Sequence, residues 1–178
     1  MSRLWAERRQ VFLTPQALGG FKAMKELTVV LSNHFVRYAV IPALDGAASR
    51  EEELALARFH FARVHGERVK GWEVRLSPGT RLACAVDAAL VEGLKACASV
   101  QPFLMWAFNR WRRRIPRSGA WLVLREPERV CVGMVAGNDW RSVCNTHFAD
   151  HLEIIERERR RAAGEALPEL VLIQEAIA

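Results

Sequence analysis

Apolar runs rich in β-branched residues alternate with turn-forming residues in the first part of the chain. Residues 27–31 and 36–41 form two such runs, and Ser32-Asn33-His34 lies between them. This spacing predicts a β-hairpin. We expect a further, short strand over residues 10–13.

A helical period begins near residue 49. Ser49 and Glu52 have the spacing of a capping box, which satisfies two backbone N–H groups at the start of a helix. Gly66 supplies the residue that commonly ends a helix. Between these limits, apolar residues fall on one helical face, namely Leu54, Ala57, Phe61 and Val64.

A second hairpin and a helix are predicted next. Residues 72–76 and 81–85 flank the turn Ser77-Pro78-Gly79-Thr80. Asp87 stands where a carboxylate favours the first turn of a helix. Helical spacing continues through four apolar residues, Val86, Leu90, Leu94 and Cys97.

A further helix is expected from Ser99 as its cap to Pro116, which ends it. Its apolar residues are Phe103, Ala107, Phe108 and Trp111. Its last turn is rich in arginine, with Arg110, Arg112, Arg113 and Arg114. Cations at a helix C-terminus complement the helix dipole, so this cluster has a structural explanation that needs no ligand.

In the final third of the chain, apolar and polar residues alternate in a pattern that predicts a meander of three strands. These cover residues 121–125, 130–135 and 140–144, and turn formers separate them. A helix over about 150–163 and a strand over 170–173 follow. Strand, strand, strand, helix, strand is the element order of half a ribonuclease-H-like unit.

Composition places the chain among ordinary globular proteins. Of its 178 residues, 51% are hydrophobic and 26% are charged, and the formal net charge is +6. This moderate excess permits an acidic, nucleic-acid or membrane-surface partner without selecting one. The four cysteines have no Cys-x-x-Cys pair, which favours buried free thiols in a reducing compartment.

Neither a membrane span nor a secretory signal is expected. The longest apolar stretch, residues 122–136, contains four charged side chains, namely Arg125, Glu126, Glu128 and Arg129. The N-terminal residues lack the apolar segment of a signal peptide. We therefore expect a cytoplasmic protein.

The predicted elements resemble the actin-like cytoplasmic domain of the type II secretion L protein and of the type IV pilus-assembly M protein. The likeness runs through the apolar segment 28–42, the segment 81–94 and the meander that ends at Trp140. It implies a reduced, two-lobed α/β domain with mixed sheets. Residues 1–26 would precede a first lobe over 27–117 and a second over 118–178.

The resemblance implies an assembly scaffold at the inner face of the bacterial inner membrane. Its partners would be an inner-membrane assembly protein or a motor ATPase. The pilus M protein binds ATP through a turn rich in glycine and acid, and the comparable turn here is residues 32–35, which has neither. Such a turn cannot bring several N–H groups to a phosphate or anchor magnesium, so no cofactor is expected.

Candidate chemistry elsewhere is sparse. Cys144, His147 and His151 could contribute to a zinc site if Cys131 added a fourth ligand, but the second paired arm of structural zinc sites is missing. A catalytic site would use one of two polar clusters. The first lies at the turn and consists of Asn33, His34 and Arg37. The second consists of His60 and His65 near Glu51–Glu53. No nucleophile elbow accompanies them, so we expect no enzyme activity.

The stretch 106–117 interleaves aromatic residues with arginines. A nucleic-acid surface combines the same residue types, although Trp106 and Trp111 are five apart and point to different sides of a helix. Three hypotheses follow. The first is a scaffold that binds proteins, the second is a nucleic-acid-binding module, and the third is an ATPase with a degenerate pocket. In the first two, the contact residues would be Arg110, Trp111, Arg112, Arg113, Arg114 and Arg117.

Overall fold

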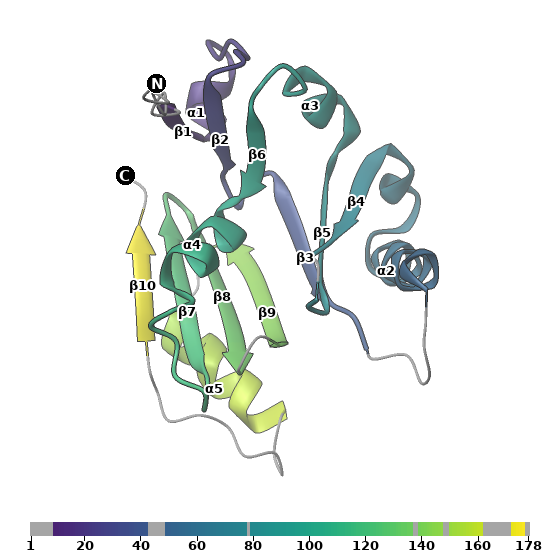
Figure 1. Cartoon of the computed structure of the whole chain (residues 1–178). Helices are drawn as coiled ribbons and strands as arrows, with labels where there is room; N and C mark the ends of the chain where they lie inside the picture. Colours follow the sequence, from purple (N-terminus) through teal and green to yellow (C-terminus); the bar gives the residue numbers. More distant parts are fainter. Residues whose placement is uncertain are drawn as a thin grey trace, which may run out of the picture.

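A computed structural model describes residues 9–42, 49–77, 79–136, 139–147, 150–161 and 172–176. Within them the chain forms a mixed α/β fold with three small sheets (Figure 1). No helix among the described residues is long and apolar enough to cross a membrane.

The first sheet is parallel and contains β1 (Arg9–Leu13), β2 (Leu27–Leu31) and β6 (Ser99–Pro102), with β2 in the centre. The short helix α1 (Pro15–Leu18) connects β1 to β2. Central parallel strands are covered on both faces and therefore carry continuous apolar runs. Val29 and Val30, which point to opposite faces of β2, are both fully buried.

The second sheet is antiparallel, in the order β3 (Val36–Val40), β5 (Leu82–Asp87), β4 (Trp72–Leu76). Helix α2 (Arg50–His65) packs against it through Ala57 and Phe61. The expected capping box is present: the Ser49 side chain accepts from the Glu52 N–H, and the Glu52 carboxylate accepts from the Ser49 N–H. A 3-10 turn, η1 (Gly66–Gly71), leads from α2 into β4.

The third sheet has the order β10-β7-β8-β9. Strands β7 (Ala120–Glu126), β8 (Arg129–Ala136) and β9 (Asp139–His147) form the expected antiparallel meander. Helix α5 (His151–Arg161) follows, and β10 (Leu172–Ala176) pairs with β7 in parallel. The element order expected for half a ribonuclease-H-like unit is therefore confirmed.

Alternation along β7 divides the third sheet into two packed faces. Leu122 and Leu124 point to α4 (Phe103–Trp111), whereas Trp121 and Val123 point to α5. The sheet is thus covered by a helix on each face, as Figure 1 shows.

The close approach of the Trp140 side chain requires a glycine at position 133 of β8. A Cβ atom at this position would lie 2.5 Å from Cζ3 of Trp140, whose side chain is fully buried. Glycine therefore provides the space that the indole fills, and Trp140 in turn packs against Phe108 of α4.

Two predicted local structures are wrong. Residues 27–31 and 36–41 do not form a hairpin: β2 lies in the parallel first sheet, and β3 pairs with β5 in the second. Ser99 does not cap a helix, because it begins β6 and pairs with Thr28. In both places the partner strand is distant in the sequence, and its hydrogen bonds override the local turn or cap signal.

Two helices are shorter than predicted. Helix α3 (Ala88–Gly93) is followed by turns before Cys97, and α4 ends at Trp111, so that Arg112–Arg114 lie in a turn. Asp87 is the N-cap of α3, and its carboxylate accepts from the N–H of Ala89. The predicted strand over 170–173 begins outside the described residues, which place β10 at Leu172–Ala176.

Candidate functional site

The backbone N–H groups in the turn between β2 and β3 are hydrogen-bonded to other groups of the protein. The Asn33 N–H donates to Oε2 of Glu126 at 2.8 Å. The His34 N–H donates to Oγ of Ser32 at 3.1 Å, and the Phe35 N–H donates to the Ser32 carbonyl at 3.0 Å. A phosphate cradle needs several N–H groups directed at one anion. Here all three are engaged within the protein, one of them by a carboxylate of β7.

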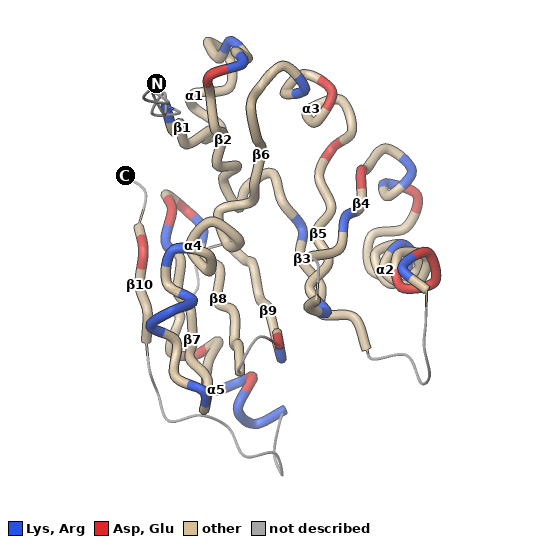
Figure 2. Tube along the Cα trace, viewed as in Figure 1, with Lys and Arg blue, Asp and Glu red and all other residues tan. Residues whose placement is uncertain are grey.

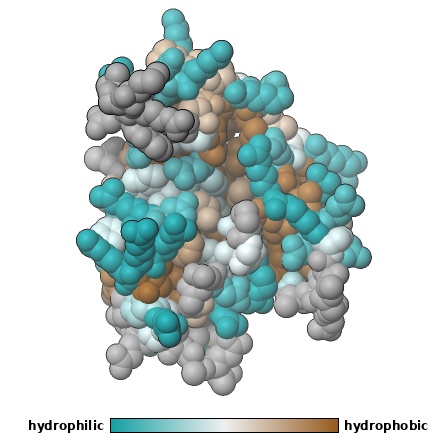
Figure 3. Space-filling model, in the orientation of Figure 1, coloured by the Kyte–Doolittle hydropathy of each residue, from teal (hydrophilic) through white to brown (hydrophobic). Residues whose placement is uncertain are grey.

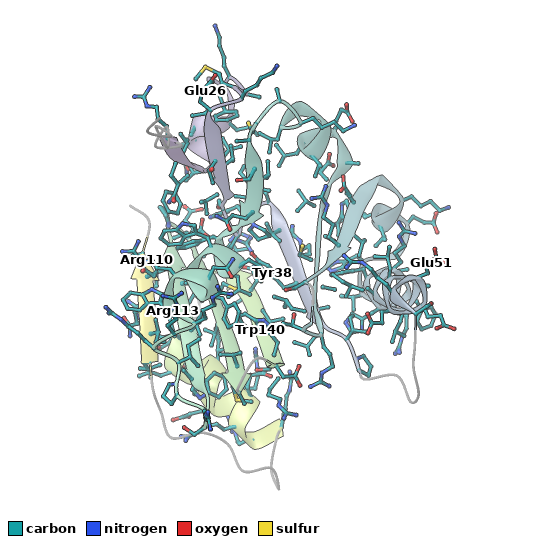
Figure 4. All side chains as sticks on the ribbon, in the orientation of Figure 1. Glu26, Tyr38, Glu51, Arg110, Arg113 and Trp140 are labelled. Carbon is teal, nitrogen blue, oxygen red and sulfur yellow. The ribbon has the colours of Figure 1, made fainter. Side chains whose placement is uncertain are left out.

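A polar network joins this turn to the third sheet. The hydroxyl of Tyr38, which lies between the sheets in Figure 4, donates to Oδ1 of Asn33 at 2.7 Å. Nδ2 of Asn145 donates to the carbonyls of Asn33 at 2.8 Å and Val36 at 2.9 Å. Nη1 of Arg129 donates to Oδ1 of Asn145 at 3.2 Å. These bonds fix β3 beside β9.

Burial raises the pKa of Tyr38 well above its ordinary value, so its hydroxyl stays protonated and able to donate. Burial also lowers the pKa of Arg129. Asn33 is fully buried, and its Nδ2 atom has no partner among the described residues. The same is true of Oε1 of Glu126 and Nε of Arg129. The junction is therefore a polar cluster that water reaches poorly.

A hollow of about 370 Å³ adjoins Glu126 and Arg129 at the β7–β8 turn. Its other lining residues are Arg125, Glu128, Val130, Asp150 and His151. Three carboxylates face two guanidinium groups here, so the summed charge does not favour a phosphate.

An apolar groove lies where the first sheet, α3 and the second sheet meet. It encloses about 180 Å³. Figure 3 shows exposed hydrophobic surface over this part of the molecule, between β6 and the second sheet. Its apolar lining comes from four elements and consists of Leu31, Val86, Val91, Leu94, Val100 and Pro102.

Two thiols add to the apolar character of the groove. Burial raises the pKa of Cys84 to about 11, against an opposing effect of the nearby Arg75 charge. The thiol is therefore protonated near neutral pH and behaves as a small, weakly polar group. Cys97 lines the same groove, and all four cysteines of the chain are free.

Charged residues complete the lining of the groove. Nε of Arg75 donates to Oε1 of Glu73 at 2.6 Å on β4. Lys95, after α3, pairs with Glu92. The groove thus offers an apolar floor with one carboxylate and two cations, Glu73, Arg75 and Lys95, among its lining residues.

The arginine-rich segment is divided by the structure. Arg110 and Trp111 face β10: Nε1 of Trp111 donates to Oε1 of Glu175 at 2.6 Å, and Nε of Arg110 lies 3.3 Å from the same oxygen. The guanidinium of Arg114 lies 5.0 Å from the Trp111 ring centroid. Figure 2 shows this positive segment of α4 beside the acidic position on β10.

The remaining predicted contact residues, Arg112, Arg113 and Arg117, are exposed. No hydrogen bond, ion pair or ring contact within the described residues involves their side chains. Trp106 is used inside the protein, since its ring packs 5.0 Å from that of Phe12 and its Nε1 donates to Gln10 at 3.1 Å. Arg112, Arg113 and Arg117 are thus exposed, whereas Trp106 is engaged inside the protein and is not free to stack on a base.

The three weak metal candidates each have separate partners. Sγ of Cys144 accepts from Arg157 at 3.2 Å. Nε2 of His147 lies 2.5 Å from Nη2 of Arg129, and Nδ1 of His151 lies 2.8 Å from Nη2 of Arg125. Among the described residues, no group of three or more His, Cys, Asp or Glu side chains could hold a metal ion.

The polar residues considered for catalysis at the turn contact neighbouring backbone carbonyls. Nε2 of His34 bonds the Pro127 carbonyl at 2.9 Å, and Arg37 donates to the His34 carbonyl at 3.2 Å. His60 and His65 lie at the far end of α2 from Glu51–Glu53, with His65 about 18 Å from Glu53 along the helix axis. The structure does not bring those histidines to the carboxylates.

Residues that sequence reasoning did not select form both features of the site. Glu126, Tyr38 and Asn145 build the junction, and Val91 and Val100 line the groove. A signal was present for Glu126 alone: a carboxylate that continues an apolar strand is expected to be buried with a partner.

Comparisons with known proteins show the fold. No family model matches the chain, and no curated protein matches it. It superposes on a protein of Bacteroides thetaiotaomicron that has an actin-like ATPase fold and unknown function, with a TM-score of 0.51 and 6% identity. The match covers 84% of this chain and 58% of that chain. This chain therefore has an actin-like fold and spans little more than half the length of that protein.

Two further similarities are weaker. The cytoplasmic domain of EpsL, an inner-membrane component of the type II secretion system of Vibrio cholerae, matches with a TM-score of 0.45 and 18% identity, over 85% of this chain and 69% of that chain. A chain of the PilM–PilN type IV pilus biogenesis complex matches with a TM-score of 0.45 and 14% identity. That match covers 78% of this chain and 48% of the other chain. At these scores, neither similarity bears on function.

Proposed function

We propose that this protein is a non-enzymatic scaffold that holds a short apolar segment of a partner protein in the groove between the first and second sheets. The observation that carries the proposal is the groove itself, which has apolar lining, protonated thiol and charged groups in one place. The sequence resemblance supports a cytoplasmic role in a pilus or type II secretion-like assembly platform. Its partner there would be an inner-membrane assembly protein or a motor ATPase.

The size of the groove favours a peptide. Small-molecule and cofactor sites usually enclose about 300–1,000 Å³, and this groove encloses about 180 Å³. That volume accommodates one or two apolar side chains. An extended segment would insert these side chains and leave its backbone and flanking charges near Glu73, Arg75 and Lys95.

The closed turn supports a function without nucleotide. An ATP phosphate at Asn33 would have to displace the Glu126 carboxylate, which already accepts the Asn33 N–H. It would also be repelled by that carboxylate if the side chain stayed nearby.

A selection of peptides displayed on phage, followed by calorimetric titration of those selected, tests the groove. We expect Val91→Asp to weaken peptide binding at least about tenfold, because it places a charge in the apolar lining. The matched control is Val64→Asp on α2, where the native side chain is 63% exposed. Binding that survives Val91→Asp unchanged would refute this site.

The alternative function is nucleic-acid binding, which the exposure of Arg112, Arg113 and Arg117 favours. Affinity for single-stranded RNA would then fall steeply with salt, by a slope of about −2 in log K for three contacts. Replacing all three arginines with glutamine would remove that slope. A salt-independent or absent interaction would exclude this alternative.

A further inference from the structure

We propose that two copies of this chain associate through β4, which pairs with its own copy in an antiparallel, two-fold symmetric register centred on Val74. It rests on the unpaired edge of β4 and not on the proposed function, although Glu73 and Arg75 of this strand also line the peptide groove.

The outer edge of β4 has backbone groups available for pairing. The Ser77 N–H donates to the Leu82 carbonyl, and paired residues alternate between bonded and non-bonded positions along an antiparallel ladder. In the observed register, Glu73 and Arg75 therefore direct their backbone groups to β5. Those of Val74 and Leu76 point away. In the described part of the chain, β4 ends its sheet and no strand pairs with this edge.

The sequence of β4, Trp72-Glu73-Val74-Arg75-Leu76, is self-complementary in this register. Val74 would face Val74 of the copy, in a bonded pair that uses the outward N–H and carbonyl groups. Glu73 would face Arg75 of the copy, and Arg75 would face Glu73, on the surface of the sheet that carries charge. Trp72 would face Leu76 on the apolar surface. Every opposed pair is thus of a stabilising kind.

Three other sheet edges are less suited to this pairing. Pairing β10 with its copy about its central residue would oppose Ile173 to Glu175, and pairing β1 would oppose Gln10 to Phe12. Strand β3 is an edge of the second sheet, but Asn145 of β9 already donates to its Val36 carbonyl. The charge pattern therefore singles out β4 among these edges.

The surface beside β4 has apolar residues that a second copy would cover. A hollow of about 490 Å³ adjoins β4, and Phe59, Val69, Trp72 and Val74 are among its lining residues. Phe59 of α2 is 59% exposed. Such exposed apolar surface beside an unpaired strand edge is typical of an association site.

Sedimentation velocity over about 5–200 µM measures the association, in the affinity range expected for a small interface. Arg75→Glu makes both charges of the strand negative, and Glu73→Arg makes both positive. Each variant alone would oppose like charges across the two-fold axis. We expect each to weaken dimerisation about tenfold or more.

Sedimentation of a mixture of the two variants is the most decisive measurement. An equimolar mixture opposes an all-acidic strand to an all-basic strand, so we expect a heterodimer as strong as the wild-type dimer. A wild type that stays monomeric over the range, variants that dimerise like the wild type, or a mixture that stays monomeric would each overturn the proposal. Far-UV circular dichroism checks that both variants fold.

Hydrogen exchange on the wild type provides a test without substitution. The amides of Val74 and Leu76 should become protected as protein concentration rises, whereas that of Arg75, which faces β5, should be protected throughout. Protection of Val74 that does not change with concentration would contradict the proposed pairing.

Discussion

Replacing Glu126 with alanine tests the closed turn directly. Glu126 is 8% exposed, and its Oε2 accepts the N–H of Asn33, which is fully buried. In Glu126→Ala this N–H has no acceptor. Because both groups lie at the junction of the sheets, the loss should appear as a lower free energy of unfolding.

The size of the expected stability loss depends on both groups of the hydrogen bond between the Asn33 N–H and the Glu126 carboxylate. Leaving a buried donor unsatisfied costs about 1–3 kcal/mol. Oε1 of Glu126 is itself buried without a partner, so its removal relieves part of that cost. We therefore expect a net loss of about 1–2 kcal/mol, which corresponds to a fall in Tm of roughly 2–8 °C for a domain of this size.

Urea unfolding followed by tryptophan fluorescence measures this change, since Trp121 and Trp140 are fully buried. Glu126→Gln retains an acceptor and should lose less than Glu126→Ala. The matched control is Glu128→Gln, an exposed carboxylate two residues away that should change stability by no more than about 0.5 kcal/mol. A Glu126→Ala variant as stable as the wild type would refute the role assigned to this carboxylate.

Three further predictions concern packing, titration and capping. Gly133→Ala places a Cβ atom 2.5 Å from Trp140 and should cost about 1–3 kcal/mol in urea unfolding; an unchanged midpoint would contradict the packing. Burial raises the pKa of Cys84 from 9.0 to about 11, so the unfolded chain releases this proton first and stability should fall by about 2 kcal/mol as pH rises from 9 to 11. The Cys84→Ala variant should fall less, and equal slopes would contradict the shift. Ser49→Ala removes the capping box with Glu52 and should cost about 1 kcal/mol, with unchanged Tm as the contrary result.

The elements that the sequence predicted correctly are those whose signals are local. The capping box of Ser49 and Glu52 depends on residues three apart, and the structure reproduces it. The meander over β7–β9 follows from alternation and from turn formers between adjacent strands. The actin-like fold of the chain could be expected because a prediction of element order stays correct when the predicted ends of each element are wrong by two or three residues.

The first predicted hairpin failed because strand pairing is decided at long range. The turn formers Ser32-Asn33-His34 suit a hairpin, but they also suit a strand that leaves one sheet and enters another. The burial of both Val29 and Val30 distinguishes these cases, since a half-exposed hairpin strand alternates. The continuous apolar run of β2 was thus a usable sign of a central parallel strand.

The candidate site could not be assembled from the sequence for the same reason. Glu126 and Asn145 reach Asn33 from 93 and 112 residues away. The groove likewise draws its apolar lining from β2, α3, β5 and β6, each of which looks like ordinary core in isolation. Only the arrangement of the sheets distinguishes a lining residue from a core residue.

A thermal unfolding scan with and without ATP and Mg²⁺ tests the central claim that the turn at Asn33 is closed by the protein's own carboxylate. A ligand that binds only the folded state at about 100 times its Kd would add about 2.7 kcal/mol of stability. We predict no change in Tm at millimolar ATP. A rise of several degrees that requires Mg²⁺ would contradict the account.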